Sequence, residues 1–161
     1  MEALLYQLKE LFLAKGHCIA TAESCTGGLV ASELTEIPGS SQWFERGFVC
    51  YSNLSKQEML GVDALLIEQY GAVSQQVAEA MALGALQHSK ASISLSITGI
   101  AGPEGGSIEK PVGTVWFGYA SRTRNIVRTE HCHFSNCSRR QIRTRACRKA
   151  LAGILTLLST Q

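Results

Sequence analysis

Hydrophobic positions along the chain follow two alternating periods, one helical and one typical of strands. Leu4, Leu8 and Leu11 recur at the three- and four-residue spacing of an amphipathic helix, and Gly16 stands where a helix commonly ends. The segment that follows, 17–22, is short and partly β-branched, which predicts a strand.

The rest of the chain repeats this alternation. Ser74 is the predicted N-cap of one helix, because a serine oxygen there can accept a free amide hydrogen. Helices are predicted over 29–37, 52–61, a short acidic segment ending near Tyr70, 75–89 and 139–160, and strands over 43–51, 91–97, 112–120 and 125–134. No break in composition separates these segments. We therefore expect an α/β fold, a single domain over residues 1–161 with a mixed β-sheet and helices packed on both faces.

The composition narrows the class of protein. A chain of 161 residues with 45% hydrophobic content can bury one core. The 15 basic and 13 acidic residues leave a formal charge of +2, which is too small an excess to coat nucleic acid, so we expect no nucleic-acid partner. No apolar run reaches the roughly 18 residues of a membrane span, and the amphipathic start does not match a signal peptide, so we expect no membrane partner and a cytoplasmic location. The six cysteines form no CxxC pair, which favours reduced thiols and no metal.

Two loops rich in glycine and hydroxyl groups follow predicted strands. The first, Ser24–Gly28, leads directly into a predicted helix, and the second covers 98–107. Ligands of open α/β sheets bind at this edge, and the amides at a helix start favour an anion. Ser24 or Cys25 could instead be a nucleophile on a tight turn, and an ordinary helix cap would also explain the segment.

A second cluster of candidate groups surrounds Lys56. Ser40, Ser41, Tyr51 and Ser52 precede it. A lysine can act as the general base for a serine when burial and cationic neighbours lower its pKa, and a tyrosine can relay the proton. A surface lysine without a role is the alternative, and the spacing does not decide between the two.

The C-terminal third carries arginine and histidine side chains in regular patterns. His131 and His133 share one face of a predicted strand, and we expect both to face solvent. Arginines crowd the first turns of the last predicted helix, where their charge opposes the helix dipole. One of them could serve a bound phosphate, and a solvated basic face without a ligand is the alternative, which would account for most of the five. They are Arg139, Arg140, Arg143, Arg145 and Arg148.

Four segments, in this order and spacing, resemble a known family. They are TAESCTGG at 21–28, PGSSQWFERGFVCYSNLSK at 38–56, GAVSQQVAEAMALGA at 71–85 and SITGIAGPEGGSIEKPVGTVWFGYA at 96–120. With these segments the chain resembles the CinA C-terminal domain family, whose stand-alone members include bacterial nicotinamide-nucleotide amidases. The resemblance implies hydrolysis of the carboxamide of nicotinamide mononucleotide (NMN) to nicotinate mononucleotide and ammonia, in pyridine nucleotide salvage. It also implies a homo-oligomer that needs no metal and no cofactor.

The resemblance also implies roles for individual residues. Ser41 is the implied nucleophile, Lys56 its base and Tyr51 the group that assists the base. The implied phosphate ligand is Arg143, with Arg139 or Arg140 as substitutes, because Cys137 replaces an aspartate of the family pattern. The substrate-binding candidates are Ser24, Thr26, Gly27, Gly28, Thr98, Gly102 and Arg143.

Two other functions fit parts of the sequence. A catalytically altered paralogue could bind a nucleotide-like ligand without hydrolysing it. A phosphate-binding α/β domain could transfer phosphoryl groups, but the only acids at these loops are Glu23 just before the first, Glu104 inside the second and Glu109 at its end, and no carboxylate pair is placed for magnesium.

Overall fold

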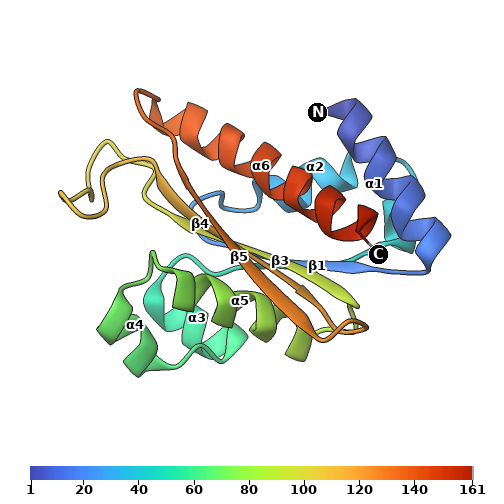
Figure 1. Ribbon diagram of the computed structural model, residues 1–161, viewed down its shortest axis with the longest axis horizontal. Coiled ribbons are helices and arrows are strands. Elements are labelled where there is room, and N and C mark those ends of the chain that lie inside the picture. The colour runs from blue at the N-terminus through green and yellow to red at the C-terminus, as the bar shows by residue number, and fades with distance from the viewer. Residues whose placement is uncertain (161) are drawn as a thin grey trace.

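The computed structural model describes residues 1–160 and shows a five-stranded sheet flanked by helices (Figure 1). The strands are β1 (Ile19–Glu23), β2 (Phe44–Val49), β3 (Ile93–Gly99), β4 (Thr114–Ser121) and β5 (Ile126–His133). Their order in the sheet is β2-β1-β3-β4-β5. Strand β1 is parallel to β2 and β3, whereas β4 is antiparallel to β3 and β5. The predicted mixed sheet is confirmed.

Helices cover both faces of the sheet, which confirms the predicted α/β architecture. They are α1 (Glu2–Lys15), α2 (Leu29–Thr35), α3 (Asn53–Leu60), α4 (Ala64–Tyr70), α5 (Gln75–Gln87) and α6 (Arg139–Ser159), and the 3-10 turn η1 (Ser40–Gln42) precedes β2. In Figure 1, α1, α2 and α6 lie on one face and α3, α4 and α5 on the other. Strand β1 is buried along its whole length, because its neighbours cover both edges and helices cover both faces.

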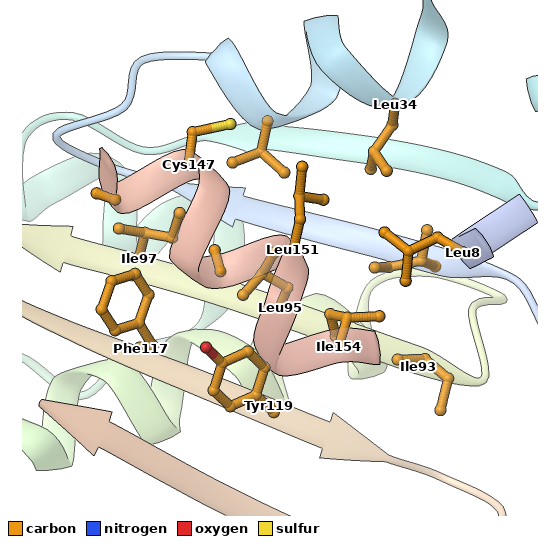
Figure 2. Packing of buried hydrophobic residues seen from close by; sticks show 14 of the residues in the cluster. Leu8, Leu34, Ile93, Leu95, Ile97, Phe117, Tyr119, Cys147, Leu151 and Ile154 are labelled. Carbon is orange, nitrogen blue, oxygen red and sulfur yellow. The ribbon is translucent and has the colours of Figure 1, made fainter. Parts of the chain in front are cut away.

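The face of the sheet beneath α6 is packed with large apolar side chains. Ile93, Leu95 and Ile97 alternate along β3 and point to this face, as the two-residue period of a strand requires. Figure 2 shows them beside Leu151 and Ile154 of α6, and all five side chains are fully buried. Each such side chain contributes about 1.5–3 kcal/mol by leaving water, so this layer holds α6 on the sheet.

The opposite face of β3 is lined by hydroxyl groups and packs closely against α5. The Ser94 and Ser96 hydroxyls donate hydrogen bonds of 2.7 and 2.5 Å to the carbonyl oxygens of Ala82 and Ala78. A Cβ atom at Gly118 of β4 would lie 2.4 Å from the Ala78 oxygen, so only glycine fits there. Small residues therefore let α5 approach the sheet closely, and the buried serine hydroxyls find hydrogen-bond acceptors on α5.

Element ends follow local sequence signals. The Ser74 hydroxyl accepts a 3.2 Å bond from the Val77 amide, which confirms it as the N-cap of α5, and Gly16 ends α1 at a φ of 64°. His131 and His133 are exposed on β5, as predicted. Within residues 1–160, no helix combines the length and the apolar content that a bilayer crossing requires.

Candidate active site

The carboxyl ends of the three parallel strands meet at one edge of the sheet, and a pocket opens there. Glu23 at the end of β1 pairs with Val49 of β2 and Ile97 of β3, so the segments after these strands lie together. The pocket has a volume of about 280 Å³. Its lining residues are Ser24, Cys25, Tyr51, Asn53, Lys56, Ala72, Val73, Thr98, Gly99, Ile100, Ala101, Gly102, Glu104, Gly105 and Arg139.

Lys56 is the most unusual group in this pocket, because its side chain is only 1% exposed. It projects from α3, and its Nζ lies 3.2 Å from each of three oxygens: Ser24 Oγ and the carbonyls of Cys50 and Tyr51. A charged ammonium has three hydrogens to donate, whereas a neutral amine has two hydrogens and one lone pair. In the neutral form, the two carbonyls take both hydrogens, and the lone pair is left for the hydroxyl of Ser24.

Burial favours that neutral form by lowering the pKa of Lys56 below its ordinary value of 10.5. Two neighbouring thiols add no negative charge at neutral pH. Burial raises the pKa of the Cys25 thiol to about 12 and also raises the pKa of Cys50. The pocket therefore contains a lysine that can accept a proton and a buried cysteine that stays protonated.

Ser24 stands directly after β1, on the turn that precedes α2. Its amide donates a 3.0 Å bond to the Ile97 carbonyl, and its carbonyl accepts from the Gly27 amide at 3.0 Å, so the backbone is held on both sides. Ser24 is 8% exposed, and both its side chain and that of Lys56 line the pocket. A serine hydroxyl hydrogen-bonded to a buried lysine is an arrangement that activates a nucleophile.

Tyr51 and Arg139 form the rim of the pocket. Tyr51 contacts Lys56 through its backbone carbonyl, while its hydroxyl accepts a 2.9 Å bond from Arg139 Nη2. Arg139 Nη1 also donates to the Gly102 carbonyl at 2.7 Å, so the guanidinium connects the rim to the second glycine-rich loop. Arg139 is thus the arginine that lines the pocket.

Of the predicted substrate-binding residues, Ser24, Thr98 and Gly102 line the pocket. The Thr98 hydroxyl donates a 2.7 Å bond to the Ala72 carbonyl, which ties the end of β3 to the segment before α5.

The structure places Thr26, Gly27 and Gly28 outside the pocket lining. Thr26 is fully buried, and its hydroxyl has no hydrogen-bond partner within residues 1–160. The amides at the start of α2 are already occupied, because the Glu23 carboxylate accepts from Gly28. The same carboxylate also accepts from the Val30 and Ala31 amides. The predicted anion site at this helix start is therefore filled by the chain itself.

Arg143 also lies away from the pocket. Its guanidinium donates to the carbonyls of Cys25 and Thr26 at 3.1 and 3.0 Å, and it lines a separate cavity of about 320 Å³. The sequence pattern could not separate Arg139 from Arg143, since both lie in the first two turns of one basic helix. The two residues share one face of α6 one turn apart, and only their tertiary contacts show which one reaches the pocket.

Ser41 lies at the other end of the sheet from Lys56. It is exposed on η1, before β2 begins, whereas Lys56 follows the end of β2. The six residues of β2 rise about 3.3 Å each, so roughly 20 Å of sheet separate the two ends. Ser41 and Lys56 of one chain are therefore too far apart to exchange a proton.

The fold and the pocket together define a class of protein domain: α/β domains with a buried serine–lysine pair at the carboxyl edge of parallel strands. Within this class, the chain belongs to the CinA C-terminal domain family, whose model matches residues 1–158, and the predicted family is thereby confirmed.

Two curated relatives are nicotinamide-nucleotide amidohydrolases named PncC. The one from Enterobacter agglomerans is 58% identical over 114 residues, which are 71% of this chain and 70% of the relative. The one from Escherichia coli K12 is 54% identical over 125 residues, or 77% of this chain and 76% of the relative. A longer CinA-like protein from Colwellia psychrerythraea is 57% identical over 120 residues, which are 74% of this chain and 27% of that protein.

Solved structures agree with this fold. A competence/damage inducible protein from Agrobacterium tumefaciens superposes with a TM-score of 0.91 and 43% identity, covering 96% of this chain and 94% of that one. A CinA superfamily protein from Klebsiella pneumoniae superposes with a TM-score of 0.93 and 31% identity, covering 99% and 98% of the two chains.

Proposed function

We propose that this chain is a nicotinamide-nucleotide amidohydrolase that converts NMN to nicotinate mononucleotide and ammonia, with Ser24 as nucleophile and Lys56 as general base. The observation that carries the proposal is the 3.2 Å contact between the buried Lys56 Nζ and Ser24 Oγ inside the pocket. The names of the relatives at 58% and 54% identity support the substrate.

Lys56 performs the first proton transfer in this mechanism. Its neutral amine removes the hydroxyl proton of Ser24 while the serine oxygen attacks the carboxamide carbon of NMN. The tetrahedral intermediate carries a negative oxygen, and the amide of Cys25 is the nearest backbone donor in sequence, as is common for the residue after a nucleophile. Collapse of this intermediate breaks the carbon–nitrogen bond, and Lys56 returns its proton to the departing ammonia.

The second half of the reaction removes the acyl group from Ser24. Water attacks the ester carbon, Lys56 takes the proton of this water, and the serine oxygen leaves and regains a proton from Lys56. The products are nicotinate mononucleotide and an unchanged enzyme. The Cys50 and Tyr51 carbonyls hold the amine in place throughout, because they accept hydrogen bonds from Lys56 Nζ in both its neutral and its charged form.

Arg139 and Tyr51 are our candidates for binding the nucleotide. NMN carries a cationic ring and an anionic phosphate, and a guanidinium at the rim suits the phosphate. The exposed ring of Tyr51 offers an aromatic face to the cationic ring of NMN. In this proposal Tyr51 assists the base through its carbonyl, and its hydroxyl orients Arg139.

We further propose that the reaction belongs to pyridine nucleotide salvage in the cytoplasm and that the enzyme is a homo-oligomer without metal or cofactor. The six cysteines are all free, as a reducing compartment would keep them. In an oligomer, the exposed Ser41 of one copy could reach the pocket of another, and this is the form in which Ser41 remains a candidate nucleophile.

The test is the release of ammonia and nicotinate mononucleotide from NMN by the pure protein, with Ser24→Ala and Ser41→Ala compared at equal concentration. We expect Ser24→Ala to lose at least about a thousandfold in kcat and Ser41→Ala to stay within about twofold of the wild type. An inactive Ser41→Ala beside an active Ser24→Ala would establish Ser41 as the nucleophile. A wild-type protein that binds NMN without releasing ammonia would be a binding paralogue.

A further inference from the structure

Two charged side chains hold the turn that carries Ser24, although neither lines the pocket. We propose that Glu23 and Arg143 are positioning residues that keep Ser24 Oγ against Lys56 Nζ. The inference rests on the proposed role of Ser24, and it gives a function to two groups outside the pocket lining.

Glu23 holds the side of the turn that presents amide hydrogens. Its carboxylate accepts bonds from the amides of Gly28, Val30 and Ala31 at 3.1, 3.0 and 2.9 Å. The side chain is 1% exposed, and a buried carboxylate with three such donors is well stabilised at the positive end of α2. The strand residue before the nucleophile thus anchors the helix after it.

The backbone of Glu23 extends this support to the base. Its carbonyl oxygen accepts a 2.8 Å bond from the amide of Cys50, and the carbonyl of Cys50 in turn accepts from Lys56 Nζ. A short chain of hydrogen bonds therefore connects Glu23 to both members of the catalytic pair.

Arg143 holds the opposite side of the turn, where carbonyl oxygens point outward. Its Nε and Nη2 bind the carbonyls of Cys25 and Thr26, across 118 and 117 residues of sequence. The rigid guanidinium fork contacts both oxygens at once, which a single ammonium cannot reproduce in the same geometry. Glu23 thus holds the turn through its amide hydrogens, and Arg143 holds it through its carbonyl oxygens.

These contacts matter because the two glycines leave the backbone of the turn flexible. Gly27 and Gly28 have φ values of 60° and 97°, which glycine adopts without strain and which leave other conformations open once the contacts are lost. A misplacement of about 1 Å can lower a rate by roughly a hundredfold. Loss of either contact should therefore slow chemistry more than it weakens substrate binding.

The experiment compares Arg143→Ala and the nearly isosteric Glu23→Gln with Arg145→Ala, an exposed arginine on the same helix. Positioning predicts a fall in kcat of at least about tenfold for the first two, with the KM for NMN within about threefold and Arg145→Ala unchanged. Arg143→Lys should recover only part of the kcat, because it retains the charge without the fork. Unchanged kcat with a KM raised for NMN but not for its dephosphorylated riboside would overturn the inference and make Arg143 a phosphate ligand.

A second measurement does not depend on NMN. An alkyl fluorophosphonate labels activated serines, because the serine oxygen displaces fluoride from phosphorus, and mass spectrometry gives the rate at Ser24. We expect labelling at least about tenfold slower in Arg143→Lys and Glu23→Gln than in the wild type. Slow labelling in these variants beside a wild type inactive on NMN would refute the proposed substrate and retain the positioning role. Equal labelling rates in all variants, or no labelling of wild-type Ser24, would refute the positioning role.

Discussion

The two ends of the parallel strands carry the same kinds of residue in different surroundings. At the carboxyl end, Ser24 and Lys56 are buried and in contact. At the amino end, Ser41 is exposed, and Lys9 donates a 2.8 Å bond to the Pro38 carbonyl in an exposed position. A serine and a lysine are therefore present at each end, but only one pair is shielded from water.

The difference shows that burial, more than residue type, separates the proposed catalytic pair from the pair at the amino end. A lysine in water stays charged and cannot act as a base, whereas desolvation of Lys56 lowers its pKa. The amino end instead uses its interior for packing, since Phe12 and Trp43 are fully buried and their rings stack at 5.4 Å.

The largest expected effect comes from the lysines. Lys56→Met keeps the length of the side chain and removes the base, so we expect kcat to fall by at least about a thousandfold. Lys9→Met, at the other end of the strands, should stay within about twofold of wild type. Ammonia release measures both variants, and equal losses would mean that the two ends do not differ in function.

The packing at the amino end should affect stability without affecting chemistry. Phe12→Ala removes one ring of the stack with Trp43 and should lower the free energy of unfolding by about 3–5 kcal/mol. Denaturant unfolding measures this loss, and kcat per folded molecule should not change. A fall in kcat in the folded protein would show that this end also shapes the pocket.

Arg139 tests whether substrate recognition is confined to the carboxyl end. Arg139→Ala removes the rim guanidinium, so the KM for NMN should rise by roughly ten- to a hundredfold, with a much smaller change for nicotinamide riboside. Arg148→Ala, an exposed residue of the same helix, is the matched control. A similar rise for both substrates would remove phosphate binding from the role of Arg139.

The pH profile examines the protonation of Lys56 directly. Because its pKa lies below 10.5 and the neutral form is active, kcat/KM should rise about tenfold per pH unit below that pKa and then level off. The free energy of unfolding should also increase with pH. Between the folded and the unfolded pKa of Lys56 the unfolded chain binds more protons, so the stability of the wild type relative to Lys56→Met should rise with pH in this range. A stability difference that falls with rising pH would contradict a lowered pKa.

The smallest expected effect concerns Cys25, which lines the pocket and which we do not propose as the nucleophile. Its pKa of about 12 leaves almost no thiolate at neutral pH, so iodoacetamide should modify the half-buried Cys18, Cys132 and Cys137 first. Cys25→Ala should change kcat by less than about threefold. Rapid inactivation that coincides with alkylation of Cys25 would point to a thiol mechanism.

Much of the fold could be predicted from the sequence, because the signals are local. Gly16, Ser74 and the alternation of β3 each determine structure within a few residues. A pocket at the carboxyl edge could be predicted from the positions of the glycine-rich loops. The filled amides at the start of α2 did not follow, since a strand carboxylate reaching back over the turn leaves no pattern of its own.

By itself, the sequence determined the order of the helices and strands and their limits to within about two residues, the family, and the set of hydroxyls, lysines and arginines from which a site could be built. Only the tertiary structure decided which of them meet. Ser41 and Ser24 both stand near strand ends, but the length of β2 carries one away from Lys56 and leaves the other beside it. Arg139 and Arg143 lie on the same face of α6 one turn apart, and that turn takes one to the pocket rim and the other to the turn that carries Ser24. Burial that lowers the pKa of a lysine is a property of all the elements packed around it, and no short stretch of sequence contains it.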